Sequence, residues 1–352
     1  MKFEAQIDLA QRTTLGVGGP AAHYVRVESE TEQRAAYDQA RALGLAVRVL
    51  GGGSNIVVSD AGFPGLVIEL SLRGIRVTES GNVTEVSAAA GEPWDDFVAA
   101  MIAEGLQGLE CLSGIPGRVG ATPIQNVGAY GQDVSETISR VVTFDTVTRR
   151  TVVFDNEACH FAYRDSVFKS KSPGRFIVTE VSFRLARNAP PAVRYAELER
   201  AFKSTRCTAP SLADARQMVL SLRRKKSMLL DPSDPNTRSC GSFFVNPVLT
   251  PAELADFAGR AQGDGNVPQF PQSDGRTKLS AGWLIEHAGF PRGTRLGNVG
   301  LSTEHALALV AHPGARATDI AELARSVQSA VHERFGVRLV PEPVFWGFSL
   351  DD

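Results

Sequence analysis

The sequence is poor in cysteine and contains no closely spaced cysteine pair. Its four cysteines, Cys111, Cys159, Cys207 and Cys240, are separated by about 30 to 50 residues, and no C-x-x-C occurs. Such pairs are typical of structural zinc sites, and dense cysteines are typical of small secreted domains. We therefore expect no bound metal and a reducing, cytoplasmic location.

The sequence also lacks an excess of positive charge and a long apolar run. Its net charge is −2 and its isoelectric point is about 6.3. Nucleic acids and anionic membranes bind to basic surfaces, so neither is expected as a partner. Met1–Thr14 has no apolar signal core, and no stretch approaches the ~18 apolar residues of a membrane span. We expect no membrane insertion and a monomeric protein.

The apolar pattern indicates an α+β protein. With 352 residues and 43 % apolar content, the chain is long enough for two or three domains with buried cores. His23–Val27 has the pattern of a strand, and Ser29-x-x-Glu32 resembles a capping box for a helix that ends at Gly44. The strands Leu45–Leu50 and Leu66–Leu70 then complete a βαβ unit.

A second α+β unit follows from Ile75. A hairpin with its turn at Glu79–Asn82 is predicted, and Val83–Ala89 is its returning strand. A helix is expected from Pro93 to Gly105, and two strand pairs are expected around Val141–Phe154 and Phe176–Leu185. Between them, Leu112–Asp133 is rich in glycine, proline and amides, which predicts a long functional loop.

The C-terminal part is predicted to form a third α+β unit. A helix from Ser211 ends in the basic cluster Arg223–Lys226, whose charges are either solvated at the helix terminus or functional. A linker that contains two prolines, Asp231–Asn236, precedes a helix capped at Thr250-x-x-Glu253. A helix over Thr318–Gly336 and a final strand over Val337–Val340 complete the unit. The predicted domains are residues 1–72, 73–210 and 211–352.

Three glycine-bearing turns indicate a large phosphate-containing cofactor. They are Gly51–Asn55, Gly114–Gly117 and Gln125–Gly131. The first follows an apolar strand and offers consecutive unhindered N–H groups to a pyrophosphate. It is not a dinucleotide-binding G-x-G-x-x-G motif, because the chain continues into the β-branched run Ile56–Ser59 instead of a helix.

The sequence resembles the UDP-N-acetylenolpyruvoylglucosamine reductase family from Thr14 to Pro343. Besides the glycine turns, the shared motifs are Tyr163–Ser166, Gly241–Pro247 and Ala281–Ile285. The resemblance implies a two-domain FAD-binding unit of the vanillyl-alcohol oxidase type, formed by residues 1–72 and 73–210. It also implies that residues 211–352 form a substrate-binding domain.

The resemblance also implies which residues contact the two ligands. The cofactor-binding positions are Gly51, Gly52, Gly53, Ser54, Asn55, Gly114, Ile115, Pro116, Gly117, Thr122, Gln125, Asn126, Gly128 and Ala129. The substrate-binding positions are Tyr195, Lys226, Asn246 and His305. Tyr195 resembles a mobile tyrosine that closes over the uridine diphosphate. Lys225 competes with Lys226 for the diphosphate, and His305 stands where other members carry glutamine, which favours a hydrogen-bonding role.

The implied reaction is the reduction of an enolpyruvyl ether of a UDP-sugar to UDP-N-acetylmuramate, with FAD as cofactor and NADPH as hydride donor. Hydride addition to an alkene conjugated with a carboxylate needs stabilisation of the developing enolate and a proton donor. Arg164 is the candidate for the first task, because its planar fork can hold a carboxylate through two hydrogen bonds. Without the resemblance, a local ion pair with Asp165 is the simpler interpretation of this arginine.

Ser242 and Glu342 are the other candidate catalytic residues. A serine after glycine is usually a cap or turn hydroxyl, but the family motif places Ser242 as the proton donor. Glu342 lies between Pro341 and Pro343 on a stiff backbone, which suits a catalytic group and equally an edge-strand terminator. Near a substrate carboxylate, Glu342 is expected to have a raised pKa or a paired charge.

Two other functions are compatible with the cofactor turns. A flavin-dependent oxidase of an alcohol or aldonolactone has the same fold class, but such an oxidase would use a histidine or cysteine tether for its flavin and would not need Ser242. A non-catalytic flavin-binding regulator would keep the turns and lose the chemistry. The presence of Arg164, Ser242 and Glu342 together favours the reductase.

Overall fold

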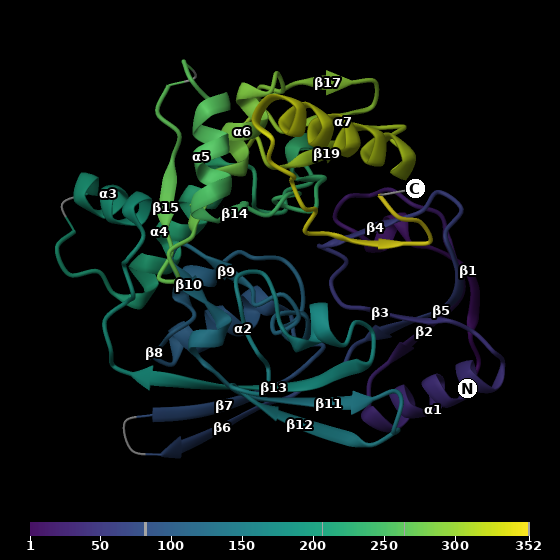
Figure 1. Ribbon diagram of the computed structural model, residues 1–352. Helices are drawn as coiled ribbons and strands as arrows, with labels where there is room; N and C mark the ends of the chain where they lie inside the picture. The colour runs from purple at the N-terminus through teal and green to yellow at the C-terminus, as the bar shows by residue number, and fades with distance from the viewer. Residues whose placement is uncertain (81–82, 206, 264, 351–352) are drawn as a thin grey trace. The chain divides into compact units, whose positions relative to one another are not determined.

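The computed structural model describes residues 1–80, 83–205, 207–263 and 265–350 (Figure 1). Contacts between backbone segments divide the chain into two compact units. Unit 1 comprises Met1–Ile7, Ala21–Gly52 and Pro64–Lys225, and unit 2 comprises Asp8–Pro20, Gly53–Phe63 and Lys226–Asp352. The three-domain division at 72/73 and 210/211 stays a prediction.

The secondary structure is mixed, as expected for an α+β chain. The helices are α1 (Glu30–Ala42), α2 (Trp94–Ala103), α3 (Ala196–Thr205), α4 (Leu212–Lys225), α5 (Pro251–Arg260), α6 (Ala281–His287) and α7 (Ala317–Phe335). The strands are β1 (Glu4–Asp8), β2 (Pro20–Val27), β3 (Val47–Leu50), β4 (Ile56–Val58), β5 (Phe63–Leu70), β6 (Ile75–Ser80), β7 (Val83–Ala89), β8 (Leu106–Gln107), β9 (Gly128–Ala129), β10 (Gln132–Asp133), β11 (Ile138–Asp145), β12 (Thr151–Asp155), β13 (Phe176–Arg187), β14 (Val248–Leu249), β15 (Gln269–Pro271), β16 (Thr277–Leu279), β17 (Arg295–Leu296), β18 (Val299–Leu301), β19 (Leu309–Ala311) and β20 (Val344–Trp346).

Unit 1 begins with the predicted βαβ arrangement. Its first sheet has the order β1-β2-β5-β3, and β3 pairs with β5 in parallel. The Ser29 hydroxyl accepts the Glu32 N–H at the start of α1. In an ideal capping box the Glu32 carboxylate would accept the N–H of the N-cap residue, Ser29. Here it accepts the N–H of Glu28, one residue earlier. Gly44 ends the helix with φ of +67°. The predicted helix and its flanking strands are confirmed.

The second sheet of unit 1 is antiparallel. Its order is β12-β11-β13-β7-β6, with β8 beside β13 (Figure 1). The hairpin predicted from Ile75 is confirmed by β6 and β7, and Gly81 and Asn82 of its turn lie outside the described residues. Helix α2 buries Trp94, Phe97, Val98 and Met101 in the core of this unit.

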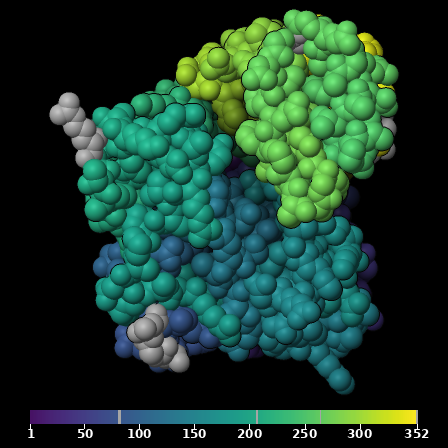
Figure 2. Space-filling model, turned by 60° about the vertical axis from the view of Figure 1, so that its left-hand side comes forward, coloured from purple at the N-terminus to yellow at the C-terminus, as the bar shows by residue number. Residues whose placement is uncertain are grey.

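Helices α3 and α4 form a satellite cluster of unit 1, and they appear as a continuous teal surface in Figure 2. Leu198 and Phe202 of α3 pack with Val219 and Leu222 of α4. Of the basic cluster at the end of α4, Arg223 is only 8 % exposed. The interpretation of these charges as a solvated group is therefore wrong for Arg223. Burial lowers the pKa of its guanidinium, opposed by the charges of Tyr130 and Asp95.

Unit 2 combines small sheets with the helices α5, α6 and α7. Strand β4 pairs in parallel with β20, and the other sheets have the orders β14-β16-β15 and β17-β18-β19. The predicted capping box at Thr250 and Glu253 is confirmed at the start of α5. Helix α7 packs Ile320, Leu323, Val327 and Val331 into the core, as its periodicity predicts. Among the described residues, no helix is long and apolar enough to cross a membrane.

The predicted final strand over Val337–Val340 is wrong. Val337 and Leu339 are buried and Arg338 is exposed, so the segment keeps the alternation of a strand. Among the described residues it forms no ladder. The Val340 carbonyl accepts the Val245 N–H, but Pro341 and Pro343 follow and lack the N–H groups that would extend this pairing. A single bridge joins Pro341 to Phe244, and the last strand of the chain is β20.

Candidate active site

In unit 1 the first two glycine turns meet. A Cβ atom built on Gly52 would lie 2.6 Å from the Cα atom of Gly117. Real Cβ atoms do not approach backbone so closely, so the backbones of the two turns are in direct contact at this point. The structure thus brings together two segments that the sequence assigned separately to the cofactor. The absence of a side chain at Gly52 serves this contact.

The Gly114 turn is fixed by a carboxylate that sequence reasoning missed. Asp95, in the first turn of α2, accepts the N–H of Gly114 at 2.5 Å and a two-pronged pair from Arg216 of α4 at 2.6 and 2.9 Å. Burial alone would raise the pKa of Asp95, but the hydrogen bonds from Arg216 and Gly114 outweigh it and lower the pKa. An acidic residue in a first helical turn is common, so the sequence contained no signal for this role.

Arg164 lies against the third glycine turn. Its guanidinium donates to the carbonyl oxygen of Gly128 at 2.6 Å and to that of Asn126 at 3.4 Å. Its Nη1 atom is 3.8 Å from the carboxylate of Asp133, with which it forms an ion pair. Asp165, the partner considered from the sequence, accepts the N–H of Ser166. The fork of Arg164 is therefore oriented by two backbone carbonyls, as a group must be if it is to hold a ligand.

Three residues around this turn have left-handed backbone conformations that side chains rarely adopt. The φ angles are +46° for Asn126, +49° for Tyr130 and +55° for Arg164. Asparagine adopts this region more readily than most residues, whereas for tyrosine and arginine it is uncommon and costs about 1–3 kcal/mol each. Strain of this kind clusters at functional sites. The Asn126 amide offsets part of it by bonding the carbonyl of Ala162 and the N–H of Ser135.

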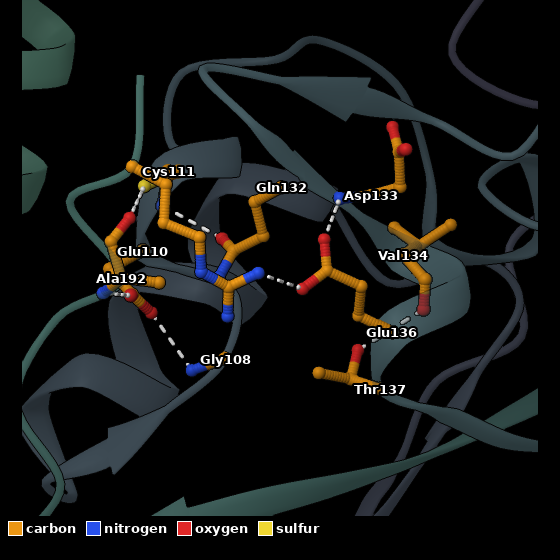
Figure 3. A network of polar contacts seen from close by, with 10 residues as sticks. Gly108, Glu110, Cys111, Gln132, Asp133, Val134, Glu136, Thr137 and Ala192 are labelled. Carbon is orange, nitrogen blue, oxygen red and sulfur yellow. Dashed lines mark hydrogen bonds and ion pairs between the residues drawn. The ribbon is translucent and has the colours of Figure 1, made fainter. Parts of the chain in front are cut away.

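A buried carboxylate anchors the segment that leads to Tyr195 (Figure 3). Glu110 is fully buried, and its two oxygens accept the N–H of Gly108 at 2.8 Å and that of Ala192 at 2.7 Å. The neighbouring Cys111 Sγ lies 3.4 Å from the carbonyl of Ala192. Both backbone groups of Ala192 are therefore bonded to the short turn that precedes the cofactor loop.

Tyr195 lies just after this anchor and is 41 % exposed. Its ring meets that of Tyr130 edge to face, with centroids 5.8 Å apart. Arg194 pairs with Glu136 at 3.0 Å. The Glu136 carboxylate also accepts the N–H of Asp133 at 3.1 Å (Figure 3). The aromatic ring is thus placed beside the third glycine turn. Its closure over a ligand stays a prediction.

In unit 2 the backbone brings Ser242 beside Glu342. The N–H of Glu342 donates to the carbonyl of Phe243 at 2.8 Å, and the N–H of Phe243 donates to Leu307 at 2.7 Å. These two bonds place Ser242 between the Glu342 segment and the turn that carries His305. The Ser242 Oγ atom is 3.4 Å from His305 Nε2. Two candidate catalytic residues, 100 positions apart in the sequence, therefore share one small region.

Asn55 of the first glycine turn lies in the same region of unit 2. Its Nδ2 donates to the carbonyl of Glu342 at 3.3 Å, and its carbonyl accepts the N–H of Val344 at 3.0 Å. On the other side, the bridge between Pro341 and Phe244 holds the extended chain. Glu342 is therefore fixed on both sides of its backbone, as its flanking prolines predict.

The remaining candidate positions are less informative. Thr122 is buried, and its hydroxyl donates to the carbonyl of Val119. Ile115 and Ala129 pack against the core of unit 1. Lys226 follows the end of α4. Asn246 accepts the N–H of Ala281 at the start of α6, so this side chain has a structural task. The roles of Lys226 and Asn246 toward a substrate stay predictions.

Comparison with known proteins decides the family. A model of the C-terminal domain of UDP-N-acetylenolpyruvoylglucosamine reductase matches residues 232–346. A reductase of this name from Thermobifida fusca is 48 % identical over 99 % of both chains. This chain belongs to the UDP-N-acetylenolpyruvoylglucosamine reductase family. Another such reductase, from Salinispora arenicola, is 47 % identical over 97 % of this chain and 95 % of its own.

Further matches confirm the fold class and the cofactor. An FAD binding domain model matches residues 21–154. The crystal structure of the UDP-N-acetylenolpyruvylglucosamine reductase from Thermus caldophilus superimposes with a TM-score of 0.67 and 28 % identity, covering 98 % of this chain and 99 % of that one. The chain is thus a flavin-dependent oxidoreductase of the predicted α+β class, with an FAD-binding unit and the C-terminal domain of the reductase family.

The first turn of this family member has the donors that FAD requires. In the part of the chain that the structure describes, the N–H groups of Gly51 and Gly52 donate to no protein acceptor. Both residues are half-buried, and such groups need a partner from water or a ligand. Consecutive free N–H groups at a glycine turn suit a pyrophosphate. Gly51, Gly52 and the Gly114–Gly117 turn would therefore hold the FAD diphosphate.

Adding a methyl group at Gly52 should release the flavin by separating the two turns. In Gly52→Ala the new Cβ would meet the Gly117 backbone, and overpacking of this kind costs about 1–3 kcal/mol. Gly259→Ala on α5 is the control, because its added Cβ would meet no atom within 4 Å and the residue lies outside the cofactor turns. Flavin absorbance per protein and thermal unfolding measure both effects. Full flavin occupancy and an unchanged melting temperature in Gly52→Ala would contradict the contact.

The Asp95 anchor should give a pH-dependent contribution to stability. Because its pKa is lowered in the folded protein, the stabilisation is present above the ordinary aspartate pKa of about 3.9 and is lost as the pH falls through the folded-state value. Asp95→Asn should lower the free energy of unfolding by about 1 kcal/mol near pH 7, since the side chain is partly exposed and screened by water. The difference from the parent should be smaller in denaturant titrations at pH 3 than at pH 7, because the carboxylate becomes protonated as the pH falls. An equal difference at both pH values would rule out the charged anchor.

Proposed function

We propose that the chain reduces the enolpyruvyl ether of UDP-N-acetylglucosamine to UDP-N-acetylmuramate, a precursor of peptidoglycan, with NADPH as hydride donor. The family match supports the reaction. The observation that carries the proposal is the position of Ser242 beside Glu342, with the Glu342 N–H donating to Phe243. A hydroxyl and a carboxylate on rigid backbone are the groups that protonation of an enolate requires.

FAD, held by the Gly51–Gly52 and Gly114–Gly117 turns, would supply the hydride-transfer chemistry, with NADPH as the hydride source and the vinyl carbon of the substrate as the acceptor. The negative charge that develops on the substrate carboxylate needs fixed donors. Arg164 supplies them, because its guanidinium is oriented by the carbonyls of Gly128 and Asn126 and cannot lose its charge. Asp133 lies beside this guanidinium and is 45 % exposed, so a substrate carboxylate can replace part of its pairing.

Ser242 would donate the proton that completes the reduction. A serine hydroxyl is a weak acid, but an enolate is a strong enough base to take its proton when the two are aligned. Glu342 approaches from the neighbouring extended segment, where Asn55 and Phe243 bond its backbone. We expect its carboxyl group to be protonated or paired with a cation near the substrate.

The UDP part of the substrate would be bound by groups outside this chemistry. Tyr195 is exposed and rests against Tyr130, so it can cover a nucleotide without breaking a core contact. Lys226 follows α4 and would meet the diphosphate, with Lys225 as the competing cation. Asn246 would contribute a hydrogen bond to this part of the substrate, whereas His305 would form its hydrogen bond beside Ser242.

Two half-reactions test this function separately. Anaerobic addition of NADPH to the flavin-loaded protein should bleach the flavin absorbance, and the enolpyruvyl UDP-sugar should restore it with formation of UDP-N-acetylmuramate. NADH in place of NADPH tests the choice of donor. Failure of the UDP-sugar to reoxidise the flavin, together with rapid dioxygen uptake on a simple alcohol, would favour an oxidase.

A further inference from the structure

A histidine lies within hydrogen-bonding distance of the candidate proton donor. His305 Nε2 is 3.4 Å from Ser242 Oγ, and both residues are half-buried. This is a long hydrogen bond, of the kind that tightens when a ligand closes the site. The proposed reaction needs the hydroxyl but does not by itself need an imidazole at this position.

The turn that carries His305 is held rigidly between β18 and β19. The amide oxygen of Asn236 accepts the N–H of Thr303 at 3.0 Å, and the N–H of Ala308 donates to the carbonyl of His305 at 3.0 Å. The N–H of Phe243 reaches the same turn at Leu307. Backbone hydrogen bonds therefore fix both the turn that carries His305 and the segment that carries Ser242. Two unrelated surface side chains would not be held in this way.

We propose that His305 is a positioning residue that returns a proton to Ser242 during the reduction, an inference that rests on the function proposed above. When the O–H bond of Ser242 breaks and a C–H bond forms on the substrate, the oxygen becomes anionic. The Nε2–H group of a protonated His305 points at that oxygen, stabilises it and transfers its proton. The N–H bond breaks, the O–H bond forms again, and the neutral imidazole is protonated by solvent.

An amide at this position would act differently. Glutamine can donate a hydrogen bond to Ser242 but has no proton to give up at neutral pH. His305→Gln therefore separates hydrogen bonding from proton transfer, and His305→Ala removes both. His312→Gln is the matched control, because it changes a histidine of the same unit whose backbone bonds Asn298 and Ala315.

The first experiment measures the two half-reactions of the flavin-loaded variants. In His305→Gln and His305→Ala, flavin reduction by NADPH should keep the parent rate, and reoxidation by the UDP-sugar should slow by about 10-fold to 10²-fold. Added imidazole should restore His305→Ala, and thiazole, which has no N–H group, should not. His305→Gln reoxidising as fast as the parent, or no rescue by imidazole, would overturn the proposal.

The second experiment needs no turnover. The nitrogen NMR signal of His305 Nε2 in the flavin-loaded protein should move in Ser242→Ala and stay in place in Ser326→Ala, a serine on α7 that bonds Glu322. An unchanged signal in Ser242→Ala would show that the pair does not form in solution. If the parent is not reoxidised by the UDP-sugar but the signal moves, the proposed function fails while the pairing of Ser242 and His305 stands.

Discussion

Ser242→Ala should slow reoxidation of the reduced flavin by the UDP-sugar by about 10²–10⁴, which is the usual contribution of a positioned general acid. The variant should still bind FAD and should still be bleached by NADPH, because neither step uses the hydroxyl. The backbone bonds of Phe243 to Leu307 and Glu342 do not involve the Ser242 side chain, so the fold of this region should persist. Stopped-flow absorbance of the flavin follows both steps.

Two further variants sharpen this result. Ser242→Cys carries a thiol of greater acidity and should recover part of the lost rate. Ser326→Ala removes a serine hydroxyl elsewhere in unit 2 and should leave both half-reactions unchanged. A Ser242→Ala enzyme that turns over like the parent would show that water or another group supplies the proton, and the mechanism would have to be redrawn around Glu342.

Arg164→Lys should slow the same half-reaction by about 10²–10³, the range found when one donor to a developing oxyanion is removed. Lysine keeps the charge but cannot bond the carbonyls of Gly128 and Asn126 while also holding a carboxylate in two bonds. Reduction by NADPH should be nearly unchanged. The rates of the two half-reactions and the affinity for the UDP-sugar should be compared between Arg164→Lys and the parent.

Arg175→Lys provides the control for Arg164→Lys. Arg175 belongs to the same unit and forms a two-pronged pair with Asp145, so the exchange tests the general cost of losing an arginine fork. We expect a small loss of stability and unchanged half-reactions. If Arg164→Lys slows both half-reactions equally, Arg164 maintains the third glycine turn and does not activate the substrate.

Elements whose determinants are local were predictable from the sequence. Helices α1, α5 and α7 carry their caps and periodicity within a few residues, and the structure confirms them. Helix α3 has buried Leu198 and Phe202 at helical spacing, a signal that the sequence analysis did not use. The seven-residue α6 is too short to show a clear period.

The parts that could not be predicted depend on distant partners. Strand β20 forms because Val344–Trp346 pairs with Ile56–Val58, nearly the whole chain away. The role of Asp95 depends on Gly114 and Arg216, which reach it from a loop and another helix. The motifs located the catalytic candidates, but only the fold shows that Arg164 is oriented by carbonyls and that Ser242 faces His305.

The non-contiguous composition of unit 2 has a consequence for synthesis on the ribosome. Its core contains Leu15, Val17 and Val57 from the beginning of the chain together with residues from α7 and Val337 near the end. Leu15 and Val57 are fully buried in the finished unit. During translation these apolar groups emerge early and must wait for nearly all of the remaining chain, exposed to misassociation. Because the core of unit 2 needs both ends of the chain, it can close only after the last strand has been translated. A C-terminal fragment made alone would lack Leu15, Val17 and Val57.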